Sequence, residues 1–120
     1  MKSIILSFDV EEFDFPREIN QKITDEHMFE ISHYGLQQIL SLLEKYNIPA
    51  TFFTTTSFAQ HYPNLIQKMS SSHEIASHGL SHQAPLNIET ITRAKKELEV
   101  VTNKSVKGFR APRWNIKDIF

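Results

Sequence analysis

The sequence contains no cysteine among its 120 residues. This absence excludes a disulfide framework and every metal site that depends on thiolate ligands. If the protein binds a metal ion, the ligands must therefore come from histidine, aspartate and glutamate. The chain offers six histidines and fourteen acidic residues for that purpose.

The chain also lacks a strong charge imbalance and any long hydrophobic run. Its formal net charge is −1, so the composition favours neither a nucleic acid nor an anionic membrane as a partner. No stretch approaches the length of a membrane span. The apolar stretch near the N-terminus is too short for the core of a signal peptide, and carboxylates follow it at once. These features predict a cytoplasmic protein and give no indication of its oligomeric state.

Segments typical of strands and helices alternate along the chain, which predicts one α/β domain. Short apolar or β-branched runs predict strands at 4–8, 50–54, 73–77 and 106–109. Helical spacing of apolar residues predicts helices at 28–46, 64–69 and 88–101. Residues 10–25 are predicted to form a long loop. This order indicates a parallel sheet with right-handed crossovers.

Three groups of polar residues follow the ends of predicted strands. Asp9 to Glu12 supply carboxylates, His78 and His82 supply two imidazoles four residues apart, and Arg110 supplies a fixed positive charge. Ligand sites of α/β folds collect at the ends of their strands. Together the three groups predict the site of a metal-dependent hydrolase.

Each group also has a simpler interpretation. A histidine pair at this spacing can lie on the surface of a helix, although Gly79 disfavours a long regular helix here. The carboxylates could solvate a loop, and Arg110 could be a surface charge. A zinc-protease helix would need glutamate directly after His78, so the glycine at that position excludes this class.

The motifs resemble those of the polysaccharide deacetylase family, which is the NodB homology group or carbohydrate esterase family 4. Its first motif appears as Ser7 to Glu12, its second as His78 to His82, and its third as Arg110 to Pro112 with Trp114 following. Pro49 to Phe53 resembles the second strand of the same fold. The resemblance implies an α/β fold that is a partial (β/α) barrel of the NodB type.

The resemblance also implies a role for each matching residue. Asp9 would be the catalytic base, and His78 and His82 would bind a divalent metal ion, expected to be zinc. Arg110 would orient Asp9. Binding of an N-acetylated carbohydrate substrate would involve two further residues, Pro112 and Trp114.

The third metal ligand is left open between two glutamates, because Val10 stands where the commonest form of the motif has its metal-binding aspartate. In extended backbone Asp9 and Glu11 project to the same side, whereas Glu12 projects to the other. Glu11 is therefore the predicted ligand, with Glu12 as the alternative.

Two later motifs of the family, including the histidine that acts as general acid, have no counterpart before Phe120. Residues 1–120 would thus be the N-terminal part of the catalytic domain, about half of a roughly 250-residue barrel, as a fragment or a truncated gene product. The predicted function of the complete enzyme is hydrolysis of N-acetyl groups on a glycan. The alternatives are an allantoinase-like hydrolase of C–N bonds and an inactive fragment that binds metal or carbohydrate.

Overall fold

The computed structural model of the chain describes residues 1–116. Its centre is a parallel three-stranded sheet in the order β1, β2, β3. The strands are β1 (Ser7–Val10), β2 (Thr51–Thr54) and β3 (Glu74–Ser77). The helices are α1 (Phe15–Glu18), α2 (Asp25–Lys45), α3 (Thr56–His61), α4 (Pro63–Met69) and α5 (Ile88–Thr102), followed by a single 3₁₀ turn, η1 (Pro112–Trp114).

The long helices begin at residues whose side chains cap them. The Thr24 hydroxyl accepts a hydrogen bond from the backbone N–H of His27 at the start of α2. Asn87 and Thr90 form a reciprocal capping box at the start of α5. Such caps satisfy backbone donors that the first turn of a helix leaves unpaired. The predicted helices are therefore present, although α2 begins at Asp25 rather than at 28.

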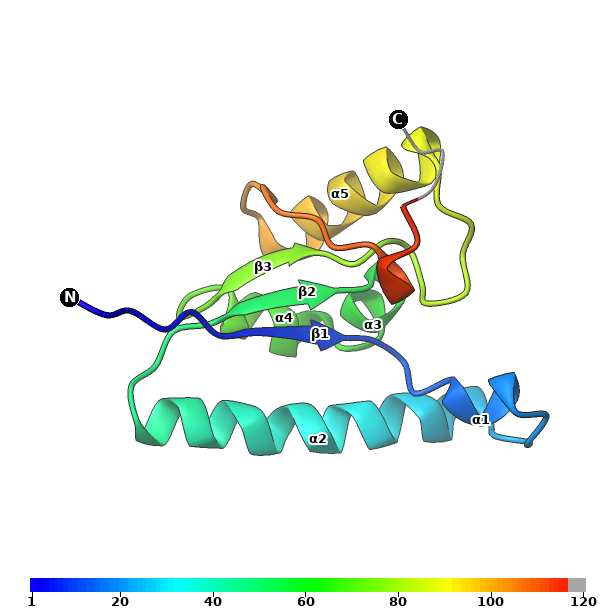
Figure 1. Cartoon of the computed structure of the whole chain (residues 1–120), viewed down its shortest axis with the longest axis horizontal. Helices are drawn as coiled ribbons and strands as arrows, with labels where there is room; N and C mark the ends of the chain where they lie inside the picture. The colour runs from blue at the N-terminus through cyan, green and yellow to red at the C-terminus, as the bar shows by residue number, and fades with distance from the viewer. Residues whose placement is uncertain (117–120) are drawn as a thin grey trace.

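The core lies between the sheet and the helices that cover it. Figure 1 shows α2 running alongside β1, with α3 and α4 behind the sheet and α5 beside β3. Phe52, Phe58, Ile66 and Leu98 are completely buried in this layer. Burying each of these side chains contributes about 1.5–3 kcal/mol to folding.

Two predicted strands differ from the structure. Ile4 and Ile5 lie before β1 and are 89% and 88% exposed, because no strand or helix within residues 1–116 covers them. The segment at 106–109 forms one isolated bridge, between Phe109 and Ser77, instead of a strand. Two backbone hydrogen bonds join this part of the chain to β3. The N–H of Ser77 donates to the carbonyl of Gly108, and the N–H of Arg110 donates to the carbonyl of Ser77.

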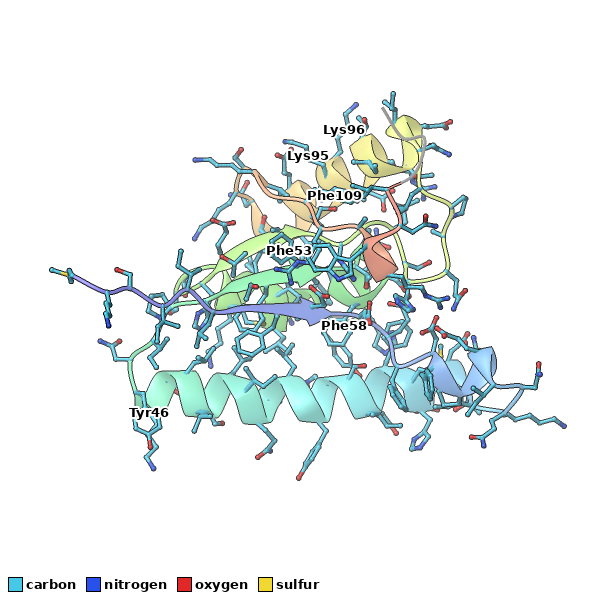
Figure 2. The ribbon with its side chains drawn as sticks, in the orientation of Figure 1. Tyr46, Phe53, Phe58, Lys95, Lys96 and Phe109 are labelled. Carbon is cyan, nitrogen blue, oxygen red and sulfur yellow. The ribbon has the colours of Figure 1, made fainter. Side chains whose placement is uncertain are left out.

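α2 and α5 bury one face and expose the other. Lys95 and Lys96 project outward from α5, and Tyr46 projects from the end of α2 (Figure 2). Within residues 1–116 no helix is both long and apolar enough to cross a membrane.

Candidate metal centre and catalytic base

The candidate site lies where the three parallel strands end. Val10, Thr54 and Ser77 occupy neighbouring positions in the sheet register. Glu11 follows the first of these strands, and His78 follows the third. His78 is only 2% exposed, so its imidazole is held within the protein at this edge of the sheet.

Hydrogen bonds fix both imidazoles in the same tautomer. His78 Nδ1 lies 2.7 Å from the carbonyl oxygen of Arg110, and His82 Nδ1 lies 2.8 Å from Asp14 Oδ1. A carbonyl and a carboxylate can only accept, so each Nδ1 carries the hydrogen and donates it. Each Nε2 is then left with a free lone pair, the state required of a metal-binding histidine.

Glu11 lies beside both of these nitrogen atoms. Its Oε2 is 3.1 Å from His78 Nε2 and 3.5 Å from His82 Nε2. Ligand atoms at about 2.0–2.1 Å from a tetrahedral zinc ion stand about 3.3 Å apart. This oxygen is buried, and within residues 1–116 it has no hydrogen bond. These two distances are compatible with ligands that share one cation, and a cation there would satisfy an oxygen that has no hydrogen bond within the described residues.

Glu12 faces a different part of the protein. One of its oxygens accepts a hydrogen bond of 2.9 Å from the Thr55 hydroxyl, and the other accepts one of 2.8 Å from the backbone N–H of His82. Of the two glutamates, the structure therefore brings Glu11 to the imidazoles and uses Glu12 to connect β1 to the His78–His82 loop.

Asp9 and Arg110 form the second part of the site. Arg110 donates a hydrogen bond of 2.7 Å to Asp9 Oδ1 and one of 2.8 Å to the Ser7 hydroxyl. The guanidinium group also lies over the ring of Phe53, 4.0 Å from its centroid, a favourable cation–π arrangement. The other oxygen of Asp9 lies 3.9 Å from His78 Nε2. Asp9 is thus held beside the candidate metal position.

Opposing effects act on the pKa of His78. Burial of the ring lowers this pKa, but the neighbouring carboxylates of Glu11 and Asp9 and the Arg110 carbonyl favour the protonated ring. The net result is a pKa above the ordinary value for histidine.

Pro112 and Trp114 occupy different surroundings. Pro112 is buried, and its ring faces Gly79 in the loop between the two histidines. Gly79 has a φ of +83°, a conformation that glycine adopts without strain. Trp114 is 77% exposed, and its ring centroid lies 5.5 Å from the Arg110 guanidinium group. The role of these two residues in substrate binding stays a prediction.

A second group of possible ligands shares His82. Ligand atoms of Asp14, Glu18 and His82 lie within 4.8 Å of one another. However, His82 Nδ1 already carries a hydrogen that it donates to Asp14, and Glu18 pairs with Arg113. These partners make the group a weaker candidate for a metal ion than the position beside Glu11.

A pocket of about 480 Å³ borders the site. Asp9, Glu11 and His82 are among its lining residues, together with the acidic side chains of Glu12, Asp14 and Glu18 and with apolar side chains from β1, α2 and the segment between them. This volume falls within the range of about 300–1,000 Å³ that is usual for small-molecule sites.

The sequence profile of the family described as polysaccharide deacetylase matches residues 2–119. The chain belongs to this family. Its fold is confirmed as an α/β partial barrel by solved structures. A candidate polysaccharide deacetylase from Mycobacterium smegmatis superposes with a TM-score of 0.76 and 27% identity, over 95% of this chain and 44% of that protein.

Other relatives bear on what this chain can do. A peptidoglycan deacetylase from Helicobacter pylori is 25% identical over 92 residues, 71% of this chain and 31% of that protein. A CE4 family pseudoenzyme from Bacillus anthracis has the same fold, with a TM-score of 0.67 and 17% identity over 95% of this chain and 36% of that protein. The chain thus spans less than a third of its curated relative, and a shared fold does not by itself imply catalysis.

Sequence reasoning missed several residues that complete this deacetylase-family site. Asp14 contacts His82 and Thr55 contacts Glu12, and Ser7 and Phe53 contact Arg110. The sequence does indicate Asp14 as a candidate site residue, because it lies two residues beyond Glu12 in a run of carboxylates. Phe53 gave no signal, since an aromatic residue in a strand ordinarily indicates a core position.

Proposed function

We propose that this chain supplies the metal-binding centre and the catalytic base of a hydrolase that removes N-acetyl groups from an N-acetylated glycan. Residues 1–120 would form the N-terminal part of its catalytic domain. The observation that carries the proposal is the buried Oε2 of Glu11, which has no hydrogen bond from residues 1–116 and lies beside the Nε2 atoms of His78 and His82.

In the proposed reaction, Glu11, His78 and His82 would hold a zinc ion. When bound, zinc lowers the pKa of water and stabilises the negative charge that develops on a carbonyl oxygen during amide hydrolysis. Asp9 is placed to accept the proton of the attacking water. Arg110 keeps Asp9 ionised and oriented through their 2.7 Å contact. Protonation of the leaving amine is assigned to no residue of this chain.

The proposal is tested by acetate release from N-acetylglucosamine oligomers, in the presence of zinc, by a full-length parent that contains residues 1–120 within a complete catalytic domain. Asp9→Asn should keep its zinc affinity and lose about 10²–10⁴ in rate, because the amide cannot accept the proton. Asp25→Asn, on the exposed start of α2, is the matched control and should release acetate like the parent. Allantoin serves as the competing substrate.

Three outcomes would contradict the proposal. Equal acetate release by Asp9→Asn and the parent would remove Asp9 from the role of base. Hydrolysis of allantoin in preference to the glycan would assign the site to another C–N hydrolase. A full-length parent that binds zinc but releases no acetate would be a binding module.

A further inference from the structure

Asp14 is a buried carboxylate to which the proposed reaction gives no role. It lies four residues after the end of β1, and it is 4% exposed. Both of its oxygens are engaged by the segment that follows His78: Oδ1 lies 2.8 Å from His82 Nδ1, and Oδ2 accepts a hydrogen bond of 2.5 Å from Gln83. A buried carboxylate is costly unless such partners satisfy it.

The two contacts restrict the His82 ring in complementary ways. Asp14 can only accept a hydrogen bond, so it requires the hydrogen of His82 to reside on Nδ1. The bond from Gln83 to the second oxygen fixes the direction of the carboxylate itself. In addition, the backbone N–H of His82 is held by Glu12. Backbone and ring are therefore anchored by separate carboxylates.

The rings of the two histidines are held in place in different ways. His78 Nδ1 donates to the neutral carbonyl of Arg110, and burial at 2% exposure holds its ring from all sides. The side chain of His82 is 12% exposed and depends more on its hydrogen bond. A carboxylate partner also increases the basicity of the opposite nitrogen, which strengthens metal binding.

We propose that Asp14 is a positioning residue that fixes the tautomer and direction of His82, so that Nε2 faces Glu11. The inference rests on the metal centre of the proposed function. It predicts that Asp14 acts through the imidazole and does not itself bind the ion.

The first experiment needs no metal. Long-range ¹⁵N–¹H correlation spectra of the metal-free chain at mildly alkaline pH report which ring nitrogen of His82 carries the hydrogen. The parent and Asp14→Asn, whose carbonyl still accepts, should show the hydrogen on Nδ1. Asp14→Leu should lose this single tautomer. The inference is overturned if the parent carries the hydrogen on Nε2, or if Asp14→Leu keeps the tautomer of the parent.

The second experiment measures zinc affinity by calorimetry in the same variants and in Glu18→Gln. Loss of a supporting partner costs about 10- to 100-fold in metal affinity, so Asp14→Leu should fall in that range and Asp14→Asn should lose less. Glu18→Gln should bind zinc like the parent. If Glu18→Gln loses as much affinity as Asp14→Leu, the ion is held by Asp14, Glu18 and His82, and Asp14 is a ligand.

The two experiments also separate this inference from the proposed function. A parent chain without measurable zinc affinity would contradict the metal centre, whereas the tautomer of His82 would still decide the role of Asp14. Rescue by Asp14→Asn distinguishes positioning from a general loss of folding, since Asp14→Asn and Asp14→Leu both remove the charge but only Asp14→Asn keeps an acceptor.

Discussion

Glu11 and Glu12 are adjacent in the sequence, but their side chains lie in different surroundings. The strand period places Glu11 on the same side as Asp9, and in the structure both approach His78 Nε2. Glu12 turns to Thr55 and the backbone of His82. The alternation of side chains in extended backbone correctly predicted which glutamate lies beside the imidazoles, and the role of Glu11 as a metal ligand stays a prediction.

Substituting each glutamate by glutamine should separate metal binding from stability. Glu11→Gln should lower zinc affinity by more than the roughly 10- to 100-fold expected for a supporting residue, with little change in the free energy of unfolding. Glu12→Gln should cost about 1–3 kcal/mol of that free energy, because one of its buried hydrogen bonds is lost. Zinc titration and denaturant unfolding measure the two quantities. A larger loss of zinc affinity in Glu12→Gln would show that Glu12 is the ligand.

The raised pKa of His78 predicts how the stability of the metal-free chain depends on pH. A raised pKa means that folding favours the protonated ring. The contribution of this ring to the free energy of unfolding is therefore fully present below the pKa of the unfolded state, about 6.5. That contribution is lost as the pH rises through the higher pKa of the folded state. The difference in unfolding free energy between the parent and His78→Gln should therefore shrink as the pH rises across this window. A difference that grows with pH would contradict the cause given for the shift.

The run of carboxylates marks Asp14 as a candidate residue, but its contact with His82 could not be predicted from the sequence, and neither could the contact of Phe53 with Arg110. Asp14 reaches His82 because the segment after β1 leaves the extended conformation and meets the loop after β3, 68 residues later. Phe53 serves Arg110 because β2 lies next to β1 in the sheet, with Phe53 beside Asp9 in the register. Both contacts depend on tertiary structure, which spacing along the sequence does not contain.

At the scale of elements, apolar periodicity predicted α2 and α5 well and the strands less well. Ile4 and Ile5 have the composition of a buried strand, but β1 forms only from Ser7, where it can pair with β2. The segment at 106–109 similarly forms one bridge to β3. Helices satisfy their own hydrogen bonds, whereas the extent of a strand depends on its neighbours.

Thr55 connects a helix to the site and gives a prediction at this scale. Its hydroxyl accepts a hydrogen bond from Phe58 N–H at the start of α3 and donates one to Glu12. Thr55→Val should lower the free energy of unfolding by about 1–3 kcal/mol, since it leaves buried groups unpaired. Thr55→Ser, the matched control, keeps the hydroxyl and should lose clearly less in denaturant unfolding. Equal losses would mean that these hydrogen bonds contribute little to stability.

For the whole molecule, the division between the two faces of the sheet explains where the site lies. The helices pack against one face, where Phe52 and Ile75 are buried, and Asp9 and Phe53 belong to the opposite face with Arg110. This arrangement is that of a barrel wall, with helices outside and the functional groups at the carboxyl ends of the strands. The order of strands and helices predicted this architecture, and the family match confirms it.

The central claim is that Glu11, His78 and His82 hold one zinc ion beside Asp9. Crystals of the chain grown with zinc, measured at the zinc absorption edge, would locate the ion by its anomalous scattering. We expect one strong anomalous peak, about 2.0–2.2 Å from a carboxylate oxygen of Glu11 and from the Nε2 atoms of His78 and His82. A peak beside His82 Nδ1, between Asp14 and Glu18, or no peak near Glu11, would contradict the claim.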